Sequence, residues 1–288
     1  MANRKRTPTF SVQKLVRTLL LIAGGITVCL LIPAIAKFLV FTPIFSLIST
    51  EKEINKSIVA LLTSAVIVLS YYYFFLIVEK RKIPDLNLKQ LPSALLFGSA
   101  IGFGIISLVI GILYLMGNYS VYSVNSMSVL LQPFLLFLVM GVFEEIIFRG
   151  IIFRIIEEFW GIRSALLISS FLFGFTHFSN SGFNYFSGIA ISLHLGLLTA
   201  IVFSIYRNIW YPVFLHVSWN MAFVIYGVTV SGANDIPSYM NASLTGPTII
   251  SGGLFGPENS ILTIIISLVV FLFLYSKKTI AVSAEKRK

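Results

Sequence analysis

The chain has 288 residues, of which 57% are hydrophobic and only 11% are charged, and its formal charge is +10. Soluble domains contain about 25% charged residues, so this composition excludes a water-soluble globular protein. A helix needs about 20 apolar residues to cross a bilayer core. We therefore predict an all-α polytopic membrane protein, a single integral membrane domain over residues 1–288, with eight spans: Leu15–Phe41, Ser57–Val78, Leu91–Met116, Val129–Ile156, Ser164–Phe178, Tyr185–Ile205, Trp210–Val228 and Ile261–Tyr275.

The first span follows a basic stretch that contains Arg4, Lys5 and Arg6. Its apolar run is too long for a cleaved signal peptide, so we predict a retained signal anchor. The single Cys29 lies inside this span and is predicted to pack as an apolar side chain. Lys37 lies near the far end of the span, where its ammonium group is expected to reach the outer interface. The second and third spans are predicted only as hydrophobic helices.

The fourth span carries two adjacent carboxylates, Glu144 and Glu145, in its middle. Ionisable groups at membrane depth are costly and are therefore candidates for function. Arg149 lies four residues after Glu145, which places the two side chains on one helical face as an ion pair. Glu144 points about 100° away and is left to face another group.

Each of the next three spans contains one histidine: His177, His194 and His216. Asn220 follows His216 by four residues and shares its helical face. His194 matches no motif and is predicted to pack in the core. The segment 229–260, rich in Gly, Pro, Ser and Asn, is predicted to be a folded-over extracytoplasmic loop before the last span.

The basic residues give an independent check on the number of spans. With a cytoplasmic start and eight spans, 17 of the 21 lysines and arginines fall on the cytoplasmic side, and only Lys52 and Lys56 fall on the far side. This is the distribution that the positive-inside rule requires. It predicts a multi-pass protein of the cell membrane with both termini in the cytoplasm. It also accounts for the positive charge without a nucleic-acid partner.

The polar residues of the later spans are predicted to lie at similar depths. Counted from the nearest cytoplasmic arginine, Glu144, His177, His216 and Asn220 lie about 15, 21, 13 and 19 Å into the membrane. One pocket can therefore hold all four. A glutamate there can act as a general base for water, an imidazole can orient that water, and a second histidine with an amide can stabilise an oxyanion. These groups are typical of a hydrolase that acts on an amide or an ester.

Three motifs carry a resemblance to a known family. Residues 144–149 read Glu-Glu-Ile-Ile-Phe-Arg, residues 173–177 read Phe-Gly-Phe-Thr-His, and residues 216–220 read His-Val-Ser-Trp-Asn. In this order, on successive spans, they resemble the Glu-Glu-x-x-x-Arg, Phe-x-x-x-His and His-x-x-x-Asn motifs of the CPBP family, which comprises CAAX prenyl proteases and bacteriocin-processing enzymes and is also called the Abi family. The motif-bearing core covers about residues 128–228.

The resemblance implies a peptidase, a glutamate-dependent intramembrane endopeptidase of eight helices. It makes Glu144 the base that activates water, His177 its partner in positioning that water, and His216 with Asn220 the oxyanion site; Glu145 and Arg149 become a supporting pair. Family members are often called metalloproteases, and Glu144, His177 and His216 could hold zinc. Because the chain has no His-Glu-x-x-His, we favour the arrangement without a cofactor.

The same residues are compatible with two functions of other classes. The same fold could serve as a non-catalytic membrane scaffold or immunity protein, or the buried carboxylates and histidines could form the relay of a proton-coupled transporter. For the peptidase, the substrate partner is a peptide or protein at the membrane. A prenylated CAAX tail, a bacteriocin-like peptide and a membrane regulator are all compatible with the motifs.

Overall fold

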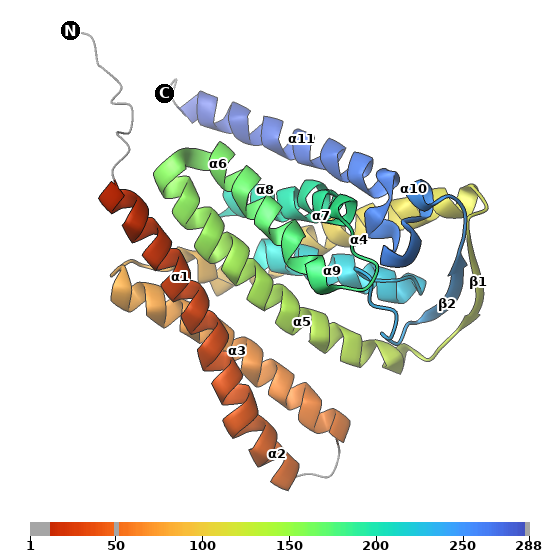
Figure 1. The fold of residues 1–288 in the computed structure, drawn as a ribbon, viewed down its shortest axis with the longest axis horizontal. Coiled ribbons are helices and arrows are strands. Elements are labelled where there is room, and N and C mark those ends of the chain that lie inside the picture. Colours follow the sequence, from red (N-terminus) through yellow and green to blue (C-terminus); the bar gives the residue numbers. More distant parts are fainter. Residues whose placement is uncertain (1–11, 49–51, 286–288) are drawn as a thin grey trace.

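A computed structural model describes residues 12–48 and 52–285 of the chain. Each of the eight predicted hydrophobic segments is helical over nearly all of its length. The protein is therefore an all-α polytopic bundle, as predicted. Figure 1 shows the helices packed side by side, with a small two-stranded sheet at one edge.

The first three helices form the N-terminal part of the bundle. Helix α1 (Val12–Ile35) continues through a π-helical segment, η1 (Ala36–Phe41), into α2 (Thr42–Ile48). The first helix thus runs seven residues beyond its predicted end. Helix α3 (Lys52–Val78) packs against α1 and against α5 (Leu131–Glu145).

Helix α4 (Leu91–Leu115) packs closely along α9 (Trp210–Tyr226), the helix that carries the His-x-x-x-Asn motif. Two short 3₁₀ segments, Pro84–Leu86 and Leu88–Gln90, precede α4. The approach is close because α4 presents glycine to its neighbour. A Cβ atom added at Gly102 would lie 2.2 Å from the backbone oxygen of Leu215, so the two backbones are in direct contact there.

The fourth and fifth predicted spans form one winding path. Helix α5 runs into a π-helical segment, η5 (Ile146–Phe153), then into α6 (Arg154–Phe175) and a 3₁₀ turn, η6 (Thr176–Ser179). Gly161, with φ of 81° and ψ of 170°, breaks α6. The predicted turn between these two spans is at this glycine, because a residue with a side chain rarely adopts such a φ.

The remaining spans close the bundle. Helix α7 (Tyr185–Ile191), the π-helical segment η7 (Ser192–Gly196) and α8 (Leu197–Tyr206) are continuous and make up the sixth predicted span. The last helix, α11 (Ile261–Glu285), packs on α8 and η7.

The segment 229–260 contains more regular structure than predicted. Strand β2 (Met240–Leu244) pairs antiparallel with β1 (Tyr119–Val124), with Tyr119 opposite Leu244 and an irregularity between Val121 and Ser123. Three short helical turns follow: α10 (Thr248–Ser251), Gly253–Phe255 and Pro257–Asn259. The segment folds back far enough to bury Glu258 against α9.

Five of the described helices are long and apolar enough to cross a membrane by length and composition alone. They are Val12–Ile48, Ile54–Val78, Leu88–Leu115, Tyr185–Tyr206 and Ile261–Ile280. The other three predicted spans are those that carry the motifs. These spans do not meet the criterion for three reasons. Gly161 interrupts α6, charged side chains lie among the apolar ones, and α9 has only 17 residues.

A network of charged side chains ties the α3–α4 connection to the start of α6. Arg154 pairs with Glu79 at 2.9 Å, and Arg81 pairs with Glu79 at 3.2 Å and with Asp85 at 3.0 Å. Burial raises the pKa of Asp85, but the hydrogen bonds and charge of Arg81 outweigh this effect and hold that pKa below its ordinary value. The network therefore holds Arg154, the residue that follows η5, in place. Arg149 lies within the same π-helical segment.

Candidate active site

Residues from all three motifs meet in the interior of the bundle. Glu145, at the end of α5, pairs with Arg149 at 3.2 Å, and both side chains are fully buried. The other carboxylate oxygen of Glu145 accepts a hydrogen bond from Nδ1 of His216 on α9 at 2.9 Å. The ion pair expected from the four-residue spacing is thus present, and it extends to a third motif residue.

Arg149 also holds the neighbouring elements together. Its Nη2 donates to the backbone oxygen of Gly196 in η7 at 2.9 Å. Its guanidinium carbon lies 4.5 Å from the centre of the Phe173 ring on α6. A buried guanidinium is stabilised when its donors are satisfied and its flat face rests on an aromatic ring. This one side chain therefore connects three spans.

Phe173 lies at the centre of the site. Its ring, which is fully buried, has its centre 5.4 Å from that of the His177 ring and 5.7 Å from that of the His216 ring. Both contacts are edge-on. The phenylalanine of the Phe-x-x-x-His motif therefore contacts both imidazoles, a role that its sequence position alone did not indicate.

Glu144 differs from its neighbour Glu145. Its side chain is 16% exposed, and its Oε2 lies 3.9 Å from Nε2 of His216, too far for a direct hydrogen bond. Among the described residues, nothing donates a hydrogen bond to this buried oxygen. A carboxylate oxygen with free acceptor capacity, facing an imidazole nitrogen, is an arrangement that can bind and activate water.

The other two predicted site residues lie close by. His177 is in the η6 turn, partly exposed, and its Nδ1 is 3.1 Å from the backbone oxygen of Phe173. Asn220 is 5% exposed and lies one turn beyond His216 on α9. Within the described part of the chain, no hydrogen bond joins either side chain to Glu144. The structure thus brings Glu144, Glu145, Arg149 and His216 into one cluster, and the Phe173 ring contacts both His216 of this cluster and His177.

Three further residues support α9 and were not predicted as part of the site. The fully buried His194 ring in η7 stacks on Trp219, with centres 5.2 Å apart and planes inclined by 18°. Trp219 Nε1 donates to Glu258 at 2.8 Å, and Ser231 donates to the other oxygen of the same carboxylate. His194 therefore packs, as predicted, but it packs on the residue next to Asn220. No local signal in the sequence marks Glu258 as the partner of α9.

The donor types suit zinc in part. The Nδ1 atoms of His177 and His216 are bonded to a carbonyl and a carboxylate, the pattern that commonly orients histidine ligands of a metal. Yet no three His, Cys, Asp or Glu side chains of the described ranges are grouped closely enough to hold an ion.

Comparison with known proteins shows which family the motif-bearing segment is similar to. Residues 126–222 match the family "Type II CAAX prenyl endopeptidase Rce1-like". The chain is also 31% identical over 114 residues to the "Putative membrane peptidase YdiL" of Bacillus subtilis, an alignment that covers 40% of this chain and 42% of that protein. The chain thus aligns with about two fifths of this relative's length. No solved structure matches. Because the matched segment contains all three motifs, the predicted resemblance to the CAAX prenyl endopeptidases of the CPBP family is confirmed.

Proposed function

We propose that the chain is an intramembrane endopeptidase that hydrolyses a peptide bond in a membrane-associated or lipidated substrate. The observation that carries the proposal concerns the Oε2 atom of Glu144. This oxygen is buried, accepts no hydrogen bond from the described residues and lies 3.9 Å from Nε2 of His216. The family match over the three motifs supports it, since that family consists of endopeptidases. Glu145 differs, because one of its oxygens is bonded to His216 and the other lies 3.2 Å from the Arg149 guanidinium, as expected of a structural carboxylate.

In this mechanism Glu144 is the general base. It takes a proton from a water molecule while the water oxygen bonds to the carbonyl carbon of the substrate. His177 donates through Nδ1 to the Phe173 carbonyl, so its Nε2 carries a lone pair and can accept the second proton of that water in a hydrogen bond. When the carbon–nitrogen bond breaks, Glu144 returns its proton to the leaving amine.

His216 and Asn220 stabilise the negative oxygen that forms on the substrate. The Asn220 amide is a donor without charge. Since Nδ1 of His216 donates to Glu145, its Nε2 donates to the oxyanion when the ring carries a proton on each nitrogen. Glu145 and Arg149 do not touch substrate in this scheme; they fix the tautomer and the orientation of His216.

The test is a comparison of Glu144→Gln with Glu158→Gln in the purified, reconstituted protein. Glu158 is a matched control because its side chain is 62% exposed and lies outside the site. Glu144→Gln keeps shape and hydrogen-bonding capacity but removes the base, so we expect cleavage to fall by at least about 100-fold. His177→Ala is expected to abolish cleavage as well, while both variants insert normally.

Two peptides with the same sequence, one farnesylated at a CAAX cysteine and one unmodified, would report the substrate class. In cells, a membrane-associated peptide whose terminus differs between wild type and Glu144→Gln would identify the natural substrate. Full cleavage by Glu144→Gln would refute the assignment. Absence of product in both strains, with a phenotype that Glu144→Gln leaves intact, would favour a non-catalytic scaffold.

A further inference from the structure

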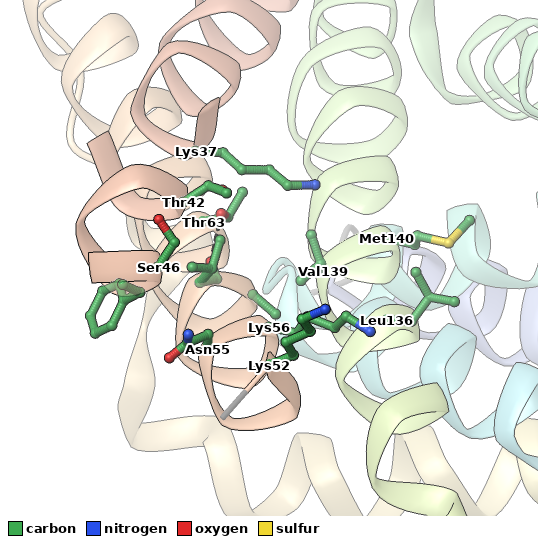
Figure 2. Close-up of a pocket in the computed structure, with 13 residues that line it drawn as sticks. Lys37, Thr42, Ser46, Lys52, Asn55, Lys56, Thr63, Leu136, Val139 and Met140 are labelled. Carbon is green, nitrogen blue, oxygen red and sulfur yellow. Dashed lines mark hydrogen bonds between the residues drawn. The ribbon is translucent and has the colours of Figure 1, made fainter. Parts of the chain in front are cut away.

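The pockets formed by the described residues differ in the groups that line them. Figure 2 shows one between the first helix, α3 and α5, whose lining includes the lysines Lys37, Lys52 and Lys56. Another pocket, of about 670 Å³, is built mainly by the segment 229–260 and is called the sheet-side pocket below. None of its lining residues carries a charge, and six of them are glycine, so its walls expose much main chain.

The sheet-side pocket adjoins the elements that carry two of the motifs. Gly182, in its lining, lies five residues after His177, in the connection from η6 to α7. Gly227, also in the lining, ends α9 seven residues after Asn220. These seven residues correspond to about 10 Å along the helix axis, a distance that about three extended residues cover. A substrate that extends from the candidate active site toward the sheet can therefore reach this pocket.

Asn259 gives the pocket an acceptor that the protein does not use. This lining residue is only 5% exposed, and its Oδ1 is buried without a donor among the described residues. Its neighbour Glu258 is held in place, because it accepts a hydrogen bond from Trp219 at 2.8 Å. An unsatisfied buried acceptor costs about 1–3 kcal/mol. A ligand that supplies an N–H or O–H group would therefore be favoured here.

The rest of the lining restricts the chemistry of that ligand. Three other polar side chains already bond within the protein, those of Asn184, Thr229 and Ser251. A charged ligand would find no opposite charge in the lining, and a prenyl or acyl chain would give Asn259 no donor. An extended peptide has a main-chain N–H at every residue except proline.

Strand β2 adds contacts that suit the side chains of such a peptide. Ala242 and Leu244 are alternate residues of this strand, so they lie on one face of it, and both line the pocket. They offer apolar contacts beside the glycine-rich main chain. The volume of the pocket lies within the usual range of ligand sites, about 300–1,000 Å³, and suits a segment of a few residues.

We propose that the sheet-side pocket binds an extended, uncharged segment of the peptide substrate, with a main-chain N–H of that segment donating to Oδ1 of Asn259. This inference rests on the proposed function and narrows the substrate class. Residues on one side of the scissile bond carry no charge and are recognised largely through their main chain. A lipid group of the substrate then lies outside this pocket.

Peptide binding, measured by fluorescence anisotropy, tests the inference separately from cleavage. The full chain with Glu144→Gln is used in a neutral polyoxyethylene detergent. The probe is a mixture of decapeptides randomised over Gly, Ala, Ser, Thr and Asn and labelled with an uncharged dye, and its Kd is expected to lie below about 1 mM. A mixture in which Lys or Glu fills half of the positions is expected to bind about 10-fold more weakly or worse.

Asn259→Leu removes the acceptor but keeps a side chain of similar size. Affinity for the uncharged mixture is expected to fall about 3–10-fold, the value of one hydrogen bond. The thermal unfolding midpoint is not expected to fall, because Oδ1 of Asn259 has no donor to lose within the described residues. A purely structural asparagine would show the opposite pattern.

Thr248→Trp and Ser243→Trp form a matched pair that does not depend on Asn259. Both positions are exposed, but Thr248 lines the pocket, whereas Ser243 belongs to the face of β2 opposite Ala242 and Leu244. Thr248→Trp places an indole ring in the lining and is expected to weaken binding about 10-fold or more. Ser243→Trp is expected to leave the affinity unchanged.

Several results would overturn the inference. No binding of the uncharged mixture, unchanged affinity in Asn259→Leu, or an equal loss in both tryptophan variants would each exclude a peptide in this pocket. Displacement of the peptides by maltose at similar concentrations would mean a sugar site. Cleavage that Glu144→Gln abolishes, with a KM that Asn259→Leu leaves unchanged, would refute this pocket alone. Peptide binding here without cleavage by the wild type would refute the proposed function alone.

Discussion

Glu144 and Glu145 are adjacent in the sequence, yet their side chains have different surroundings. Glu145 is fully buried between Arg149 and His216, so its charge is balanced by hydrogen-bonded partners. Glu144 is partly exposed and one of its oxygens accepts no hydrogen bond from the described residues. Since adjacent helical residues point about 100° apart, one helix can present one carboxylate for structure and another for chemistry.

The buried pair gives a stability prediction. Arg149→Met leaves the Glu145 carboxylate buried without its main counter-ion, which is expected to lower the free energy of unfolding by about 3–5 kcal/mol. The double variant Glu145→Leu/Arg149→Met removes both charges and is expected to be less destabilised than the sum of the single changes. Unfolding in detergent, followed for the four proteins of this cycle, checks the expectation. Additive losses would show that the pair does not act as a unit.

The motifs alone identified the charged residues of the candidate site, but not the residues that contact them from other elements. The spacing from Glu145 to Arg149 predicted the ion pair because both ends lie on one helix. The contacts of Phe173 with His216, and of Trp219 with Glu258, join different elements. No periodicity in one sequence reports which elements become neighbours, so these contacts emerged only from the packing.

At the scale of elements, the position of His216 depends on how closely α9 approaches α4. A Cβ atom at Gly102 would lie 2.2 Å from the Leu215 oxygen and 2.4 Å from the Ser218 hydroxyl, whereas one at Gly104 would meet nothing within 4 Å. The two glycines are thus a matched pair on one helix. The first permits helix contact, and the second only loosens the helix.

Alanine at these two positions should therefore have opposite effects. Gly102→Ala forces the helices apart and is expected to destabilise the protein by about 1–3 kcal/mol, with loss of cleavage because His216 moves. Gly104→Ala is expected to be neutral or to stabilise by up to about 1 kcal/mol, through its better helix propensity. Thermal unfolding and cleavage rates of both variants test this. Equal behaviour of the two would mean that the α4–α9 contact is adaptable.

Helices were predictable from the sequence because each hydrophobic run contains its own signal. The strands were not. The segment Tyr119–Val124 pairs with Met240–Leu244, more than 100 residues away, and each strand is too short to stand out beside spans of 20 residues. The π-helical segments η1, η5 and η7 likewise have no simple sequence signature, although η5 carries Arg149 and η7 carries the Gly196 carbonyl that Arg149 binds.

At the scale of the whole molecule, the path of the helices brings the predicted cytoplasmic segments together. In Figure 1 the start of α1, the α6 turn near Gly161 and the C-terminal end of α11 lie on one side, and the β1–β2 sheet lies on the other. A chain that crosses the bundle an even number of times has both of its ends on the same side. The structure thus agrees with the grouping of the basic loops, while the assignment of that side to the cytoplasm remains a prediction.

Cysteine labelling can decide that orientation, because the chain has a single cysteine. Cys29 is the single cysteine, so Cys29→Ala gives a background without a thiol. Because Cys29 is buried, alanine can take its place as a small apolar side chain. On it, Tyr122→Cys in the exposed part of β1 is expected to react with a membrane-impermeant maleimide in intact cells. Lys82→Cys and Lys277→Cys are expected to react only after the membrane is opened. We expect these outcomes because 17 basic residues lie on the predicted inner side, and basic loops of membrane proteins are retained in the cytoplasm. Labelling with the reverse pattern would show that the chain has the opposite orientation.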